Sequence, residues 1–462
     1  MKYLKALSCC FFLSPCFCQH NNTFYILQNI CIEGNKKTKD FIILREIDVS
    51  INDTILPQQT SVISDKTRSR LINTGLFLEV NVLWKQDSNQ SISLFISVIE
   101  RFYTYALPQL DLADRNFNEW WQDRNRDLRR LDYGFDIKQK NIRGRNETLT
   151  LRLVAGFNQK AEMYYSIPYI DKNLRTGITF NIGYITNKQV AYRSFQHKLD
   201  FYEHPSTART RFTSGFSLMR RNKFYALHTL STSLNYNTVA DTITRLNPDY
   251  FLHESARQFF ISLRYTYVYD RRDRFYYPTK GYYIRVETEM LGMKIFTDLN
   301  MYSMYAEWNT YVPLSKRLYF ASGIRTKSSL PTLQPYYNQR GLGYKNYWVS
   351  GFERYVIDGQ HYGLIKTNLK LKIFETVVRQ RFIRSEKFNK QPWELFLKWH
   401  NDAAYVVDNT INPNNSTLSN RWIAGTGLGL DLVTYYDIVI RMEYSMNSKL
   451  ESGFFLHMKA AI

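Results

Sequence analysis

Apolar and polar side chains alternate with a period of two along much of residues 102–462, which is the pattern of extended strands. Residues 261–270 show it: one face carries Ile261, Leu263, Tyr265, Tyr267 and Tyr269, and the other carries Ser262, Arg264, Thr266 and Asp270. Residues 438–445 repeat it, with an arginine and a glutamate on the polar face. An apolar outer face and a charged inner face reverse the plan of a soluble core. The pattern therefore predicts a barrel in lipid with a water-filled lumen.

The predicted fold is mainly β, with about 16 antiparallel strands in a barrel spanning residues 131–462. Residues 102–462 number 361. About 9–11 residues per strand in the bilayer, with turns and loops, give roughly 22 residues per strand and an even total. Residues 102–130 show little periodicity and are predicted to be a lead-in to the barrel. We expect the first strand near residues 131–139 and the last near residues 454–462.

Residues 1–18 predict an export signal, because two lysines precede a short apolar stretch and small residues follow it. Residues 13–16 loosely resemble a lipoprotein cleavage box, although Pro15 stands where a small residue is wanted. Four of the five cysteines lie in this segment, which leaves Cys31 without an internal disulfide partner. No later apolar run reaches about 18 residues, so no transmembrane helix is predicted. The aromatic content of 16% favours a membrane barrel.

The formal net charge of +20 raises nucleic-acid binding as an alternative. No compact block of lysine and arginine stands out, however, and most arginines fall at polar strand positions or in turns. We expect them to line the lumen and to contact anionic lipid head groups, with no nucleic acid bound. The histidines are scattered, and no zinc spacing, nucleophile elbow or phosphate loop occurs, so no enzyme, metal or cofactor is predicted. Glu287 and Glu289 share one strand face, as a polar lumen stripe would.

Residues 24–101 predict a small α+β module in the order β-α-α-β-β. A strand-like segment ends at Gly34, and Thr38 is a candidate cap for the first helix. A second helix is expected to begin near Ser64 and to end before Gly75, and two strands follow around a polar turn. The order and the two glycine turns resemble a POTRA domain. POTRA domains are small periplasmic modules of polypeptide-handling outer-membrane proteins.

The segment Tyr269–Gly281 resembles a signature of the BamA/TamA family of outer-membrane assembly proteins, Asp-x-Arg-Asp followed by Pro-x-x-Gly. The matching positions are Asp270, Arg272, Asp273, Pro278 and Gly281. Proline cannot donate to a strand ladder and glycine permits positive φ, so the segment predicts a strand end, a turn and a new strand. The acids and arginines can pair within the wall.

Residues 337–363 resemble the long loop of the same family that folds back into the barrel. In the family the loop tip reads Val-Arg-Gly-Phe, and its arginine contacts acids on the wall. Here the tip is Val349, Ser350, Gly351 and Phe352, so serine replaces the arginine.

The acid on the wall is retained as Asp402. A buried aspartate without a cation is costly, and Arg340 or Arg354 is therefore predicted to be its substitute partner. Gly425, Gly427 and Gly429 predict a strand that a neighbouring backbone approaches closely.

The resemblance implies an assembly factor in the outer membrane of a Gram-negative bacterium, with its POTRA-like domain in the periplasm. Its partners would be unfolded outer-membrane protein clients, membrane lipids and accessory lipoproteins. Clients would add a strand to the POTRA sheet and enter the membrane through a seam between the first and last barrel strands. Two alternatives stay open: a polypeptide secretion pore of two-partner type, and a passive porin-like barrel.

Overall fold

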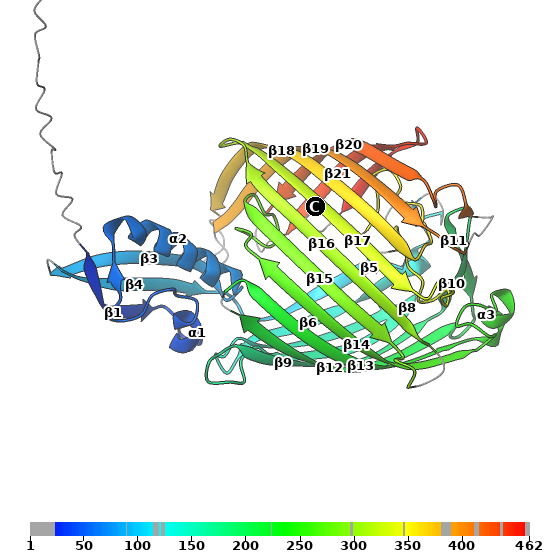
Figure 1. Cartoon of the computed structure of the whole chain (residues 1–462), viewed down its shortest axis with the longest axis horizontal. Helices are drawn as coiled ribbons and strands as arrows, with labels where there is room; N and C mark the ends of the chain where they lie inside the picture. Colours follow the sequence, from blue (N-terminus) through cyan, green and yellow to red (C-terminus); the bar gives the residue numbers. More distant parts are fainter. Residues whose placement is uncertain are drawn as a thin grey trace, which may run out of the picture.

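The chain forms a small α+β domain followed by a large β-barrel, as the computed structural model shows (Figure 1). The predicted export signal, residues 1–18, lies outside the residues that the structure describes. The described residues are 24–88, 90–113, 120–121, 125–222, 224–295, 299–344, 347–379, 390–410, 415–434 and 438–457.

The N-terminal domain is a four-stranded sheet covered by helices. Its sheet order is β2-β1-β4-β3, and β1 and β4 run parallel. The elements are β1 (Tyr25–Glu33), α1 (Asp40–Leu44), β2 (Thr54–Ile55), α2 (Pro57–Asn73), β3 (Phe77–Ser88) and β4 (Ser91–Glu100). Leu27, Ile43, Leu71 and Leu94 are fully buried in its core. The predicted α+β module is therefore confirmed, with one extra short strand.

Two local expectations in this domain are wrong. Helix α2 begins at Pro57 rather than near Ser64, because proline suits the first helical position and the Gln59 side chain accepts the Leu56 N–H at 3.2 Å. Thr38 does not cap α1; its hydroxyl donates to Glu100 at 2.5 Å instead. The predicted helix end holds, since Gly75 adopts a positive φ of 68° directly after α2.

The barrel is one antiparallel sheet of 16 strands in the order β22 through β12, then β9 through β5. This agrees with the predicted strand number. The strands are β5 (Thr104–Leu112), β6 (Leu131–Ile142), β7 (Glu147–Gly156), β8 (Asn158–Ile167), β9 (Thr176–Asn187), β12 (Arg209–Asn222), β13 (Ala226–Val239), β14 (Arg257–Asp270), β15 (Gly281–Leu291), β16 (Met301–Pro313), β17 (Leu318–Leu330), β18 (His361–Arg379), β19 (Lys390–Val407), β20 (Trp422–Val433), β21 (Val439–Asn447) and β22 (Ser452–His457).

The barrel begins earlier than predicted. Residues 104–112, assigned from the sequence to the lead-in, form strand β5, which pairs with β6 from Thr104–Gln139 to Leu112–Leu131. The first strand is therefore not at residues 131–139, and the lead-in is reduced to the residues between β5 and β6. Pro108 weakens the strand signal of this segment, because proline lacks an N–H and is found in sheets mainly on edge strands. β5 is such an edge strand.

The predicted in–out alternation holds along the wall. On β21, Arg441 and Glu443 are no more than 8% exposed, whereas the next residue, Tyr444, is 59% exposed. On β14, Ser262 and Arg264 line an internal cavity, whereas Tyr265 faces outward. The described part of the chain contains no helix with the length and apolar character to cross a bilayer.

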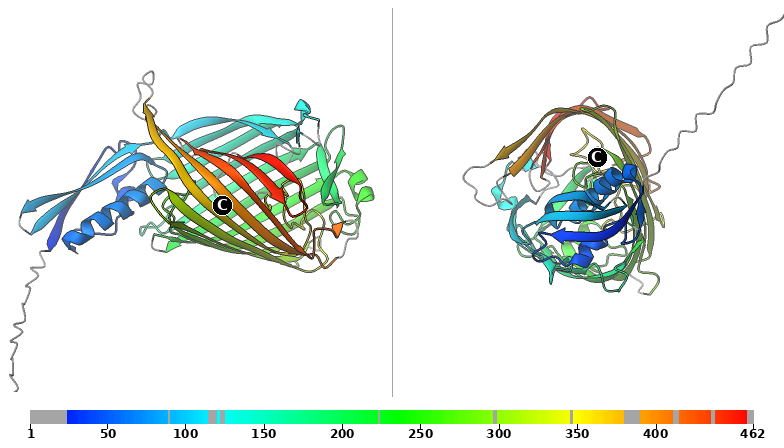
Figure 2. Two further views of the ribbon diagram at one scale, coloured as in Figure 1. Left: turned by 90° about the horizontal axis from the view of Figure 1, so that it is seen from above. Right: turned by 90° about the vertical axis from the view of Figure 1, so that its left-hand side faces the viewer.

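The N-terminal domain packs against turns at one end of the barrel (Figure 2). Glu46 is 1% exposed and accepts hydrogen bonds from Arg45 at 2.6 Å and from Arg221, at the end of β12, at 2.7 and 3.0 Å. The Arg70 guanidinium lies 3.5 Å from the centre of the Phe224 ring. The opposite end carries the hairpin of β10 (Gln189–Phe195) and β11 (Lys198–Glu203), and helix α3 (Asp241–Leu246).

Candidate functional site

The barrel sheet has two free edges among the described residues. β5 pairs with β6 and β22 pairs with β21, and no backbone pairing joins β5 to β22 in this part of the chain. β22 has six residues, Ser452–His457, and residues 458–462 of the predicted last strand lie outside the described residues. The edges carry outward apolar side chains, among them Leu110 on β5, which pairs with the exposed Tyr133 of β6, and Phe454 on β22. We call this boundary the seam.

A long loop, residues 331–360, enters the barrel between β17 and β18. It folds on itself, since Leu342 and Ile357 exchange two backbone hydrogen bonds of 3.0 and 2.9 Å. Val349 and Phe352, at the predicted tip, are at most 2% exposed. They join an apolar cluster with wall residues of β18, β19 and β20: Leu364, Ala404 and Ile423. The resemblance to an inward-folded loop therefore holds in the structure.

The loop tip is held at Asp402 on β19. The Ser350 N–H and hydroxyl both donate to the same carboxylate oxygen, at 3.0 and 2.6 Å. The Lys366 ammonium, from β18, lies 3.0 Å from that oxygen. Serine thus occupies the place of the family's arginine and still reaches the wall acid, while the cation comes from the wall.

The prediction that Arg340 or Arg354 supplies this cation is wrong, because Lys366 occupies that place. Lys366 precedes Asp402 by 36 positions, and nothing in the sequence links the two residues. Only the register of β18 and β19 pairs them. Arg340 lies instead over the Tyr344 ring, 4.6 Å from its centre. Arg354 acts electrostatically on Glu451 in the turn before β22.

Glycines allow the tip to approach the wall. Gly351 has a φ of +80°, and its carbonyl accepts a hydrogen bond of 2.8 Å from the Asn447 side chain on β21. A Cβ atom on Gly425 of β20 would lie 1.8 Å from the Ser350 carbonyl oxygen. The close backbone approach predicted for residues 425–429 is therefore confirmed. The tip contacts strands β18 to β21, next to the β22 edge of the seam.

The predicted turn motif lies at the domain end of the barrel, between β14 and β15. Asp270 accepts hydrogen bonds from the Arg272 side chain at 2.6 and 2.9 Å. Asp273 accepts the Thr279 and Lys280 N–H groups at 2.9 and 3.1 Å. Gly281 has a φ of +103°, and a Cβ atom there would lie 2.1 Å from the Arg271 carbonyl oxygen. The acids therefore shape the turn itself.

The same turn reaches across the barrel, which the sequence did not reveal. Tyr277 is 1% exposed, and its hydroxyl donates to Asp431 on β20 at 2.9 Å. Its ring lies 4.7 Å from that of Phe396 on β19. Arg274 reaches Glu394, also on β19, at 3.1 Å. The turn and the loop tip thus contact the same part of the wall, β18 to β21, at its two ends.

Comparison with known families decides the relationship. Residues 141–363 match the Omp85 superfamily domain, and residues 25–101 match the POTRA domain described as a surface antigen variable number repeat. The chain belongs to the Omp85 superfamily. The Omp85 match includes both the turn at residues 270–281 and the loop tip at residues 349–352. The protein is therefore a β-barrel of an outer-membrane family, preceded by a POTRA domain.

Two solved structures share the fold. BamA from Haemophilus ducreyi, lacking POTRA domains 1–3, is 16% identical with a TM-score of 0.52, covering 94% of this chain and 83% of that one. CdiB from Escherichia coli is 10% identical with a TM-score of 0.53, covering 96% of this chain and 92% of that one. A search of curated protein sequences found no match. At these identities the likeness concerns the fold.

One group of metal-ligand types occurs among the described residues of this Omp85 barrel. Glu353 of the loop, Glu443 of β21 and His457 of β22 bring ligand atoms within 4.8 Å of one another. The Lys398 ammonium contacts the same Glu443 carboxylate, and His457 lies 3.4 Å from it. A lysine ammonium beside the carboxylate repels a metal cation. We therefore assign Glu443 to ion pairing within the wall.

Proposed function

We propose that this Omp85 protein inserts other β-barrel proteins into the outer membrane, and that clients enter at the seam between β5 and β22. The observation that carries the proposal is the absence of backbone pairing between these edges in the described residues. Unpaired N–H and C=O groups are costly in hydrocarbon, and a client strand would satisfy them. Client folding supplies the free energy, so no nucleotide, metal or cofactor is required.

The POTRA domain offers a second edge for clients, on the periplasmic side. β2 pairs only with Tyr25 and Ile26 of β1, and turn residues 52–53 bond to Leu27. Beyond this point, residues 29–33 of β1 pair with β4 on one side and with no strand on the other among the described residues. An extended client segment can add there as an extra strand. Accessory lipoproteins and outer-membrane lipids complete the proposed set of partners.

The seam can be tested by locking it. In a Cys31→Ser background, Leu110→Cys on β5 and Leu456→Cys on β22 introduce outward-facing cysteines on the two edges. The matched control is Leu428→Cys with Tyr444→Cys, which joins two positions that already pair across β20 and β21. We expect oxidation of the seam pair to stop client insertion into liposomes and reduction to restore it, with the control unaffected. Undiminished insertion by the oxidised seam pair would refute the proposal.

A secretion pore of two-partner type is the second candidate, because CdiB from Escherichia coli matches the fold as well as BamA does, with TM-scores of 0.53 and 0.52. Such a pore passes its substrate through the lumen. Locking the seam would leave export intact, whereas fixing the loop tip to the wall would stop it. A Ser350→Cys and Asp402→Cys pair, which replaces the side-chain hydrogen bond of 2.6 Å between tip and wall by a disulfide, makes that second lock. The two locks therefore separate the candidates.

A further inference from the structure

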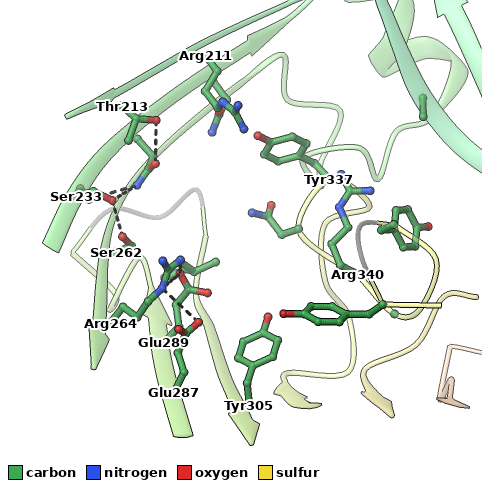
Figure 3. A pocket seen from close by; sticks show the side chains of 18 of the residues that line it. Arg211, Thr213, Ser233, Ser262, Arg264, Glu287, Glu289, Tyr305, Tyr337 and Arg340 are labelled. Atoms are coloured by element: carbon green, nitrogen blue, oxygen red, sulfur yellow. Dashed lines mark hydrogen bonds and ion pairs between the residues drawn. The ribbon is translucent and has the colours of Figure 1, made fainter. Parts of the chain in front are cut away.

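The barrel lumen holds a cavity of about 770 Å³ between the wall and the inward loop (Figure 3). Strands β12 to β17 form most of its wall side, the β10–β11 hairpin lines it as well, and loop residues 337–344 with Tyr347 form the other side. Hydroxyl and amide side chains line one part: Thr213 bonds to Asn235, and Ser233 bonds to Asn235 and Ser262, with distances of 2.7 to 3.4 Å. The cavity is therefore polar and supplies neutral hydrogen-bond donors.

One group of arginines in this cavity is neutralised by carboxylates. Arg264 lies 2.5 Å from Glu289, Arg285 lies 2.5 Å from Glu287, and Arg325 lies 2.8 Å from Glu307. Each pair joins residues of β14 to β17, and Figure 3 shows the Arg264 pair at the lower left of the cavity. In this part of the wall, each of these arginines therefore forms an ion pair with a glutamate.

A second group of arginines gathers around Tyr337 of the loop. The guanidinium carbons of Arg209 and Arg340 lie 5.2 and 5.8 Å from the centre of the Tyr337 ring. Arg211, two positions from Arg209 on the same face of β12, points at the Tyr337 hydroxyl (Figure 3). Among the described residues, no carboxylate lies within 4.0 Å of any of these three guanidinium groups.

The surroundings do not neutralise this group. Arg209 donates to neutral partners, the Asn187 carbonyl oxygen at 2.8 Å and the Tyr250 hydroxyl at 3.4 Å. Asp358 of the loop, on which Arg340 acts electrostatically without an ion pair, is engaged by hydrogen bonds from Ser194, Tyr344 and Asn415. Burial would raise the pKa of the Tyr337 hydroxyl, yet Arg209, Arg211 and Arg340 hold it below its ordinary value. The three arginines thus create a positive potential around the Tyr337 hydroxyl, at this end of the cavity.

We propose that this end of the cavity binds a polyvalent oxyanion between Arg211 of the wall and Arg340 of the loop. Guanidinium forks match phosphate and carboxylate oxygens, and confinement strengthens the attraction by excluding water. Because Arg211 belongs to β12 and Arg340 to the loop, the bound anion ties the loop to the wall opposite Asp402. The loop then has two anchors, one built from its own residues and one supplied by the ligand.

The test is isothermal titration calorimetry of the refolded full chain in a zwitterionic detergent at low salt. The probes are inorganic pyrophosphate, citrate and dispersed phosphatidylglycerol, which separate a free phosphate, a carboxylate and a lipid head group. We expect at least one probe to bind at one site per chain. Arg211→Gln and Arg340→Gln should each weaken that binding tenfold or more, and Arg211→Lys should weaken it less than Arg211→Gln.

Arg285→Gln is the matched control, because it removes an equal charge from the same cavity but from an arginine paired with Glu287. It should weaken binding less than threefold. Retained heat-modifiable migration on gels checks that each variant is folded. Binding of none of the probes, or equal losses in all three glutamine variants, would overturn the proposal, since the latter outcome indicates a general attraction to a basic protein.

Discussion

Glu46 of the N-terminal domain and Asp402 of the barrel wall are buried carboxylates at two junctions of the molecule, and they are held differently. At the domain end, Glu46 receives two arginines, one from its own domain and one from β12. At the loop end, Asp402 receives one ammonium and the N–H and hydroxyl of Ser350. Arginine forks fix direction as well as charge, whereas lysine acts as a point charge. The domain joint therefore depends on side-chain charge, and the loop anchor depends on how closely the tip backbone approaches the wall.

The largest effect is expected from breaking the domain joint with Glu46→Gln. Removing one partner of a buried ion pair costs about 3–5 kcal/mol. At about 1.4 kcal/mol per factor of ten, hydrogen exchange of residues 37–48 should speed up by a hundredfold or more. Asp65→Asn, which breaks the exposed pair with Arg68, is the control and should cost less than about 1 kcal/mol. Equal exchange in the two variants would show that the joint does not depend on Glu46.

The loop anchor should break without any change in charge when Gly425 becomes alanine. The new methyl group would lie 1.8 Å from the Ser350 carbonyl oxygen, and such overpacking costs about 1–3 kcal/mol. We expect the tip to leave the wall and ion conductance in planar bilayers to rise. Gly363→Ala on β18 is the control, because nothing lies within 4 Å of its added methyl group. A loop anchored chiefly by charge would leave both variants at the parental conductance.

Restoring the family's arginine sharpens the comparison further. Ser350 is 3% exposed and Lys366 already neutralises Asp402, so Ser350→Arg alone should destabilise the tip by about 1–3 kcal/mol. Lys366→Ala vacates the position, and the double variant should recover about 1 kcal/mol relative to additive costs. Thermal unfolding of the four variants in detergent measures this coupling. Additive costs would show that the arginine and the lysine do not compete for Asp402.

The smallest expected effect is a pH dependence of the loop. Burial, with Glu443 nearby, raises the pKa of Glu353 to about 8, whereas an unfolded glutamate titrates near about 4.3. The folded state thus favours the protonated form, and its stabilisation is complete below the unfolded pKa and is lost as pH rises toward 8. Between pH 7 and pH 8 the loop should lose about 1 kcal/mol, seen as faster exchange of residues 347–357. Glu353→Gln should abolish this slope, and an unchanged slope would assign it to another group.

Sequence patterns located the elements whose signals are local. Strand alternation predicted the barrel and its strand number, and the glycines at 425, 427 and 429 predicted a strand that a neighbouring backbone approaches closely. The loop tip was correctly placed opposite Asp402 from its resemblance to the family. Each of these features depends on a few neighbouring residues that must have a particular period or size.

The missed features depend on pairing between distant residues. Lys366 meets Asp402 only because β18 and β19 pair in one register, and Tyr277 reaches Asp431 across 154 positions of sequence. β5 was missed because Pro108 interrupts the strand signal at an edge where no N–H is needed. The arginines around Tyr337 come from β12 and the loop, so only the folded chain shows that none of the described carboxylates pairs with them.

The central claim is that the β5 edge accepts a client strand, and site-specific photo-crosslinking tests it most directly. A photoreactive side chain is placed at Leu110 on β5 or, as the control, at Leu153 on β7, which also faces outward but lies on a strand paired on both sides. During client assembly, we expect crosslinks from position 110 to the client's terminal strands and none above background from position 153. Equal crosslinking from the two positions, or none from position 110 while clients insert normally, would contradict the proposed role of the β5 edge.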